Sequence, residues 1–237
     1  MNRFHTLQRL VLFIVILAST QAFSETISSN FLVVGFVGGF VRHNDAVHQE
    51  VQLANRLRND FPSGVDIDVF ANHSGRQAYR TILRSLDQDH NGTLSEAERR
   101  DARIILYGHS WGASETIAIA RMLQHDGIPV RLTIQVDSVA KPGFNDRLIP
   151  PNVDRAVNFY QLNGLLHGQR KIVAMDPERT HILGNIRLDY RLHSVNCDGY
   201  PWYARLFMRP HIEIESDPRV WDRIDSMIRA ELSQVIR

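Results

Sequence analysis

The chain alternates between short apolar runs and segments with helical spacing. Residues 30–40, NFLVVGFVGGF, form a continuous apolar run with two glycines near its end. Such runs are typical of strands buried on both faces of a sheet. Further strand patterns lie at 65–70, 102–107, 130–136 and 155–161, and helical patterns lie at 45–59, 74–86 and 111–124. This alternation predicts an α/β fold, with a mostly parallel central sheet and helices on both faces.

The composition indicates a globular protein and excludes several kinds of partner and site. The chain has 237 residues, of which 43% are hydrophobic, so a single globular domain is expected over residues 25–237. Its 27 basic and 26 acidic residues leave no charge excess that indicates a nucleic acid or an acidic lipid as partner. A single cysteine, Cys197, excludes an intramolecular disulfide and a cysteine-based metal site. No partner protein can be inferred.

The first 24 residues have the pattern of a signal peptide. Arg3 and Arg9 precede an aliphatic run at 10–18, LVLFIVILA, and small residues follow it up to Ser24. The alternative is an uncleaved membrane anchor, but the run is well short of the roughly 20 residues that cross a bilayer. We therefore expect cleavage after Ala22 or Ser24, a mature protein without a transmembrane span, and a secreted or periplasmic location.

The sequence GHSWG at 108–112 matches the pattern G-x-S-x-G. It lies between a predicted strand and a predicted helix, which is the context of a nucleophile elbow. In such a turn the serine hydroxyl, here that of Ser110, projects from the end of the sheet, and glycines avoid collisions with the neighbouring backbone. The alternative is a glycine-rich turn without chemistry. On the first interpretation, Ser110 is a nucleophile that needs a base and an orienting acid.

The acid is expected after Ser110, at the carboxyl end of a strand. Asp137 directly follows the strand pattern VRLTIQV and is the best candidate, with a turn-forming aspartate as the plain alternative. Asp154 and Asp176 are further candidates, but both lie in irregular segments. We therefore expect Asp137 to orient the base.

The base is expected after the acid, in the chain order typical of hydrolase sheets. His211 lies in RPHIEIESDPRVWDRI, which we read as a loop that leads into the last helix. His193 is the main alternative, and His167 and His181 are the other downstream histidines. A surface histidine is the plain alternative for each of them. We expect His211 to be the base.

An oxyanion that develops during acyl transfer needs two backbone N–H donors. One is expected from Trp111, which follows the serine. The other is expected from the glycine turn after the first strand, at either Gly39 or Phe40.

Together, the GHSWG turn, the Gly38-Gly39 turn, Asp137 and His211 resemble the α/β-hydrolase superfamily, on its lipase, esterase and thioesterase side. The resemblance covers most of residues 30–237. It implies a secreted serine hydrolase that cleaves a carboxylic ester or thioester through a Ser-His-Asp triad. Many members of the superfamily place the acid after the strand that follows, which here is the pattern at 155–161. This chain departs from them, because that strand ends in Gln161 and no carboxylate follows it directly.

Residues 87–98, DQDHNGTLSEAE, match the twelve-residue EF-hand calcium loop. The resemblance implies Ca²⁺ as a cofactor, and these residues would hold it: Asp87, Asp89, Asn91, Thr93 through its carbonyl, Ser95 through water, and Glu98. The alternative is a solvated acidic loop in which Ser95 and Glu98 form a helix cap. With one loop and a short exit helix, we expect a structural site that holds helix 74–86 to the strand that carries Ser110.

Two other features have open interpretations. His43, Asp45 and His48 could line an acyl pocket, bind a metal or cap a helix, and we favour a cap in which Asp45 accepts from helix N–H groups. The aromatic residues between 200 and 207 belong either to a flap over the site or to the core. A second function stays open beside the hydrolase: a catalytically inactive calcium-binding module on a hydrolase scaffold.

Overall fold

The computed structural model describes residues 31–233, and the expected signal peptide at 1–24 lies outside them. Seven helices and eight strands are assigned in this part of the chain. The strands are β1 (Phe31–Val37), β2 (Val65–Ala71), β3 (Arg103–His109), β4 (Val130–Val136), β5 (Leu148–Ile149), β6 (Val153–Gln161), β7 (Val173–Ala174) and β8 (His181–Leu188). The helices are α1 (Gln49–Asp60), α2 (Gly75–Leu86), α3 (Glu96–Arg100), α4 (Trp111–His125), α5 (Trp202–Phe207), α6 (Arg209–Ser216) and α7 (Pro218–Ser233).

Six of the strands form one sheet in the order β2-β1-β3-β4-β6-β8. Every neighbouring pair in it is parallel, so all carboxyl ends lie at the same edge. β5 and β7 form a separate short parallel pair. The predicted mostly parallel central sheet is therefore confirmed.

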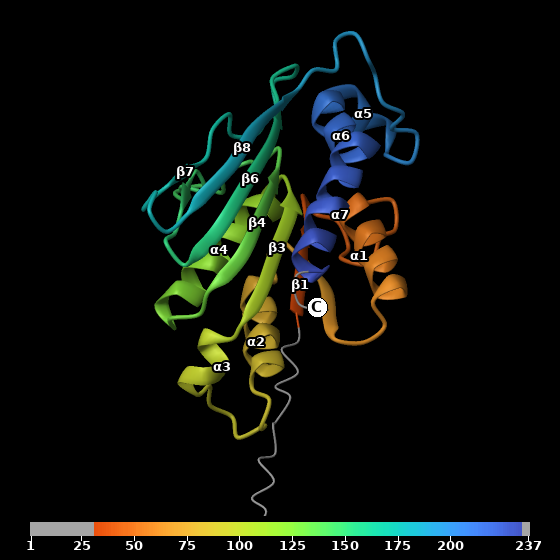
Figure 1. Ribbon diagram of the computed structural model, residues 1–237. Helices are drawn as coiled ribbons and strands as arrows, with labels where there is room; N and C mark the ends of the chain where they lie inside the picture. The colour runs from red at the N-terminus through yellow and green to blue at the C-terminus, as the bar shows by residue number, and fades with distance from the viewer. Residues whose placement is uncertain (1–30, 234–237) are drawn as a thin grey trace, which may run out of the picture.

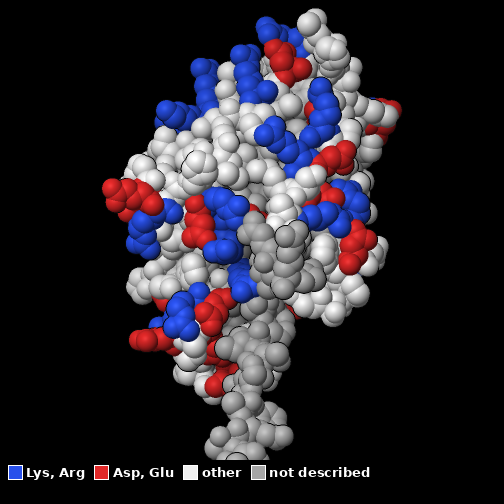
Figure 2. Space-filling view, in the orientation of Figure 1, with Lys and Arg blue, Asp and Glu red and all other residues white. Residues whose placement is uncertain are grey.

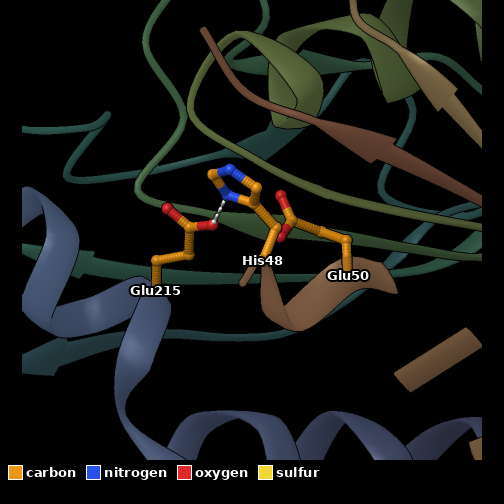
Figure 3. A group of neighbouring side chains, drawn as sticks. All are labelled: His48, Glu50 and Glu215. Carbon is orange, nitrogen blue, oxygen red and sulfur yellow. Dashed lines mark hydrogen bonds and ion pairs between the residues drawn. The ribbon is translucent and has the colours of Figure 1, made fainter. Parts of the chain in front are cut away.

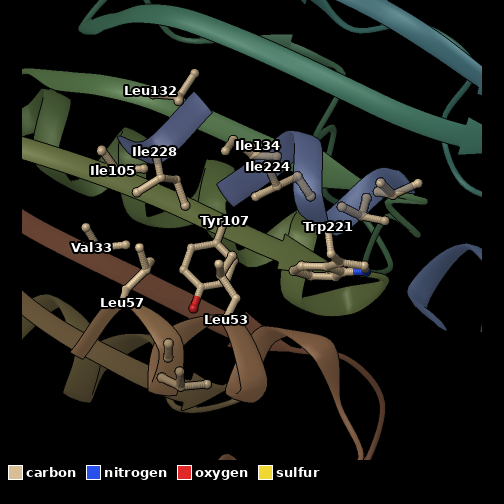
Figure 4. Packing of buried hydrophobic residues seen from close by; sticks show 14 of the residues in the cluster. Val33, Leu53, Leu57, Ile105, Tyr107, Leu132, Ile134, Trp221, Ile224 and Ile228 are labelled. Carbon is tan, nitrogen blue, oxygen red and sulfur yellow. The ribbon is translucent and has the colours of Figure 1, made fainter. Parts of the chain in front are cut away.

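Helices cover both faces of the sheet, as expected. Alternate residues of β1 and β3 point to opposite faces, so that Val33 and Tyr107 belong to one core and Val34 and Leu106 to the other. α1 and α7 cover the first core, where Trp221 lies edge-on to Tyr107 (Figure 4). α2 and α4 cover the second core. Apolar burial on both faces explains why these strands read as continuous apolar runs.

Two local expectations are wrong. The first helix begins at Gln49 instead of residue 45, and Asp45 accepts instead from the Val47 N–H in the preceding turn. His48 occupies the N-cap position without a side-chain cap.

The sequence at 162–210 has no helical or strand period and predicts no element, and in the structure this segment contains the edge strand β8. Because β8 is only half buried along its length, its sequence lacks the apolar run of the central strands.

The carboxyl edge of the sheet offers the position for a site. The chain passes from β1 to β2 on one side and then to β3 on the other, and ligands bind at such a switch point in open α/β sheets. Figure 1 shows α5 and α6 at this end, whereas α3 and the loop before it lie at the opposite end. Charges of both signs are interspersed on the face seen in Figure 2. Among residues 31–233, none of the helices combines the length and apolarity that a bilayer span requires.

Candidate active site

Ser110 occupies a tight turn between β3 and α4. Its φ of 56° and ψ of −125° are strained for a residue with a side chain, at a cost of about 1–3 kcal/mol. The turn is held by the Ser110 N–H, which donates to the Val136 carbonyl of the neighbouring strand at 2.9 Å. The hydrogen bond to the sheet therefore stabilises the strained turn, and the turn places Ser110 at the switch point.

The flanking glycines are required by close packing. A Cβ at Gly112 would overlap the carbonyl of Phe36, and a Cβ at Gly108 would lie 2.7 Å from the Gly112 carbonyl carbon. The first turn of α4 thus passes directly against the end of β1. This contact explains both glycines of the G-x-S-x-G pattern.

His211 links the expected nucleophile to the expected acid. Its Nε2 lies 2.9 Å from Ser110 Oγ, and its Nδ1 lies 2.7 Å from Asp137 Oδ2. All three residues are buried. His211 lies in α6 and not in a loop, so that expectation is wrong: Pro210 in the first turn starts a separate helix before α7. The structure thus brings the three predicted side chains together in one hydrogen-bonded row.

Asp137 is held as a carboxylate by donors from the next strand and its loop. Gly168 N–H donates to Oδ1 at 2.8 Å, and the Gln161 side-chain amide donates to Oδ2 at 2.8 Å. Burial opposes the charge, but the hydrogen bonds from His211, Gln161 and Gly168 outweigh it and hold the pKa of Asp137 below its usual value. Sequence reasoning missed Gln161 and Gly168 as partners, although Gln161 ends β6, which pairs with β4.

His109, inside the GHSWG turn, was not singled out either. Its Nε2 lies 3.1 Å from the His211 carbonyl oxygen and its Nδ1 lies 3.0 Å from Glu215 Oε2. Both partners are acceptors, so both ring nitrogens carry protons and the ring is an imidazolium. Burial opposes that charge, but Glu215 outweighs it and raises the pKa of His109. A fixed positive charge therefore lies 4.4 Å, between ring centroids, from His211.

The surroundings keep His211 neutral. Burial and then the charge of His109 lower its pKa, and together they exceed the opposing effect of Asp137. In the neutral ring, Nδ1–H donates to Asp137 and Nε2 is free to accept the proton of Ser110. This arrangement has the protonation state that the expected general base requires.

A pH profile is expected to report this pKa. Because only neutral His211 can accept a proton, kcat/KM should fall as the pH drops through its pKa, with the acid midpoint below 6.5. His109→Gln removes the neighbouring positive charge, so we expect the midpoint to move to higher pH. Initial rates of ester cleavage from pH 4 to 9 would measure both. A wild-type midpoint above 7, or a downward move in the variant, would contradict this account.

The segments expected to supply the oxyanion donors lie next to Ser110. Trp111 is the first residue of α4, where backbone N–H groups lack helical acceptors. A Cβ at Gly38 would lie 2.9 Å from Ser110 Cβ, which places the glycine turn against the serine. Phe40, in the same turn, stands edge-on to the Trp111 ring at 5.3 Å. The choice between Gly39 and Phe40 as second donor stays a prediction.

The alternative candidates lie elsewhere. Asp154 pairs with Arg131 at 2.8 Å, and Asp176 accepts from the Glu178 N–H in a turn. The histidines considered beside His211 are exposed: His167, His181 and His193. His43 and Asp45 are exposed as well.

In the loop at 87–98, backbone N–H groups donate hydrogen bonds to the loop's own carboxylates. Asp87 and Asp89 accept backbone N–H groups of Asn91 and Gly92, and Glu98 accepts from Gln88 and Ser95 N–H. Gly92, at φ +83°, makes the sharp turn. Carboxylate oxygens of Asp87, Asp89 and Glu98 lie within 4.8 Å of one another.

Two further loop residues take different positions. Thr93 donates to the Asn91 side chain through both its N–H and its hydroxyl. Ser95 caps α3, in a capping box with Glu98. The converging carboxylates fit a hard cation with oxygen ligands, and the helix cap coexists with that arrangement.

Comparison with known proteins gives no close relative. No protein-family model matches the chain. No curated protein matches it either. Among solved structures, it is similar to a cutinase-like protein from Cryptococcus sp., with 12% identity, a TM-score of 0.42 and coverage of 86% of this chain and 95% of the other. It is also similar to a protein described as a YdeN-like hydrolase from Pectobacterium atrosepticum, with 13% identity, a TM-score of 0.41 and coverage of 86% and 94%. Likeness at this level carries no argument about activity.

Proposed function

We propose that the protein is a serine hydrolase that cleaves a carboxylic ester or thioester. The observation that carries the proposal is the continuous row from Ser110 Oγ through His211 to Asp137, with contacts of 2.9 and 2.7 Å. A buried serine in a strained turn, next to a neutral histidine, has the arrangement of an activated nucleophile.

The chemistry proceeds in two steps. Ser110 Oγ attacks the acyl carbon while His211 Nε2 takes its proton, and the resulting oxyanion accepts from the N–H groups of Trp111 and of Gly39 or Phe40. The protonated His211 then gives its proton to the leaving alcohol or thiol. Water, activated by His211 in the same way, cleaves the acyl-enzyme and releases the acid. Asp137 stabilises the imidazolium in each step.

The rim of the site favours an apolar substrate. Phe40 is 91% exposed, Leu165 fully exposed, and Trp202 and Phe207 are 69% and 73% exposed. Phe40 lies against Trp111, and Leu165 belongs to the loop whose Gly168 donates to Asp137. Trp202 and Phe207 lie on α5, which contacts α6, the helix that carries His211. Exposed apolar groups on segments next to one site favour an apolar binding surface. We therefore propose an ester or thioester with an apolar acyl or leaving group.

Activity-based labelling tests this proposal. A fluorophosphonate probe should label the protein, with the adduct at Ser110 by peptide mass spectrometry, and a panel of p-nitrophenyl esters should be cleaved faster from acetate to longer chains. The inactive-module alternative predicts no label with the fold intact. Absence of labelling in a folded sample would therefore reject the hydrolase. A label without preference for longer chains would reject only the apolar substrate.

We also propose that residues 87–98 bind Ca²⁺ as a structural site. Asp87, Asp89, Asn91 and Glu98 would supply side-chain oxygens, Thr93 its carbonyl, and Ser95 a bound water. The loop precedes β3 and Ser110 follows it, so seven strand residues, about 23 Å at 3.3 Å each, separate the two. Calcium is therefore assigned to stability and not to the chemical step. The secreted or periplasmic location proposed from residues 1–24 would expose the loop to calcium.

Thermal melting is the measurement for calcium. With a Kd of about 10⁻⁴–10⁻³ M, 5 mM Ca²⁺ should stabilise the fold by about 1–2 kcal/mol, which raises Tm by roughly 2–8 °C relative to EGTA. Asp89→Ala, which removes this side-chain oxygen, should abolish the shift, whereas Asp101→Ala, just outside the loop, should retain it. The same shift in the Asp89 variant would show that calcium binds elsewhere.

A further inference from the structure

A second group of ionisable side chains lies beside the triad and shares no residue with it. His48 and Glu50 come from the start of α1, and Glu215 comes from α6 (Figure 3). All three are buried, and one ligand atom from each lies within 4.8 Å of the others. His48 Nδ1 and Glu215 Oε1 are 2.6 Å apart. Segments separated by more than 160 residues in sequence thus bring one imidazole and two carboxylates together.

Glu50 has no partner that explains its burial. Its side chain is fully buried, points toward His48 in Figure 3, and neither carboxylate oxygen is hydrogen-bonded among the described residues. Burial and then the nearby charge of Glu215 raise its pKa. An unpaired buried carboxylate is costly, and such groups are normally paired or bound to a metal.

Tyr200 completes the surroundings. Its ring stands edge-on to His48 at 5.5 Å between centroids. Its hydroxyl is buried without a hydrogen-bond partner among the described residues, and its pKa is raised by burial and by Glu215 and Glu50. Two unsatisfied oxygen-bearing side chains, those of Glu50 and Tyr200, therefore lie near the His48–Glu215 pair.

We propose that His48, Glu50 and Glu215 bind one divalent transition-metal ion, such as Zn²⁺. A nitrogen ligand with two carboxylates suits this class of ion better than Ca²⁺ or Mg²⁺, which take oxygen ligands. With bonds of 2.0–2.1 Å, neighbouring ligand atoms lie roughly 3.0–3.4 Å apart. His48 and Glu215 need only a small separation to reach that spacing, and rotation of the Glu50 side chain supplies the third ligand.

The site would tie α1 to α6. Glu215 Oε1 faces the site while Oε2 holds His109, so one carboxylate joins the ion to the turn that carries Ser110. Such a hydrogen bond to a metal-bound carboxylate orients the ligand. His211 lies on the same helix, four residues before Glu215. The ion is therefore structural, and it fixes the helix that carries the proposed base.

Zinc titration of chelator-treated full-length protein tests the site. Calorimetry is run with Ca²⁺ present and with Asp89→Ala as background, so that the loop at 87–98 cannot account for the signal. We expect one equivalent of Zn²⁺ to bind and Tm to rise. Glu50→Gln should weaken binding at least tenfold, whereas Glu231→Gln, at a buried glutamate paired with Arg155, should bind like the background protein. Equal affinity in the Glu50 variant would overturn the proposal.

Two direct measurements need no variant. The Co²⁺-loaded protein should show visible d–d bands of a nitrogen and oxygen ligand set, and zinc-soaked crystals should show an anomalous peak among His48, Glu50 and Glu215. No peak there, or peaks only at surface residues, would overturn the site. If zinc does not bind and Glu50→Gln stabilises the fold, Glu50 holds a proton instead. Neither result decides which residue the fluorophosphonate probe labels, so the hydrolase proposal is tested separately.

Discussion

Replacement of Ser110 by alanine is expected to reduce kcat/KM for ester cleavage by about 10⁵–10⁶-fold. Among residues 31–233, the Ser110 hydroxyl is the one nucleophile hydrogen-bonded to His211 Nε2, at 2.9 Å, so no described group replaces it in the covalent step. The loss should fall on kcat, with KM changed little, because the rim that binds substrate is untouched. Steady-state rates with the best ester of the panel would measure both constants.

The control is a serine in the same helix. Ser114 is also fully buried, one turn further along α4, and it does not contact His211. Ser114→Ala should therefore retain most of the activity, and both variants should melt near the wild-type temperature. Residual activity in Ser110→Ala above one tenth of wild type would show that another group carries the reaction.

The fold could be predicted from the sequence where burial has a simple pattern. β1 and β4 are covered on both faces, and so their residues form continuous apolar runs. β8 pairs on one side only and is half exposed, which removes that signal. The start of α1 was placed too early because Asp45 is a good cap in sequence, whereas in the structure it caps a turn.

The parts of the site that could be predicted are those set by residues close together in the sequence. The turn around Ser110 needs small residues at fixed offsets, and the sequence displays them. The expected order of acid and base then pointed to Asp137 and His211. The partners that set their charges come from packing between distant segments, as with Gln161 beside Asp137 and Glu215 beside His109. No spacing rule in one sequence connects such residues.

α6 joins the proposed chemistry to the proposed metal site. His211 and Glu215 are four residues apart, and so they lie on the same face of this helix. His211 reaches Ser110 and Asp137, while Glu215 reaches His48 and His109. A displacement of α6 would therefore disturb both sites at once. This coupling makes it necessary to verify folding and zinc content in every variant of the triad.

Asp137→Asn is expected to lower kcat by about 10³–10⁴-fold, with the fold retained. An amide presents both an oxygen and an NH₂ group, and the backbone N–H groups of Gln161 and Gly168 both donate to Oδ1, so the amide oxygen takes that position. The NH₂ group is then directed toward His211, which must accept at Nδ1 and carry its proton on Nε2. In that tautomer, His211 cannot take the proton of Ser110.

Asp146→Asn is the matched control, because Asp146 is fully buried and accepts from Ser138 at 2.5 Å without contacting the triad. We expect its kcat to stay within about tenfold of wild type. Fluorophosphonate labelling should slow in parallel with kcat in Asp137→Asn, since both reactions require the same proton transfer. A loss of less than tenfold in kcat for Asp137→Asn would show that Asp137 neither sets the tautomer of His211 nor stabilises its charged form.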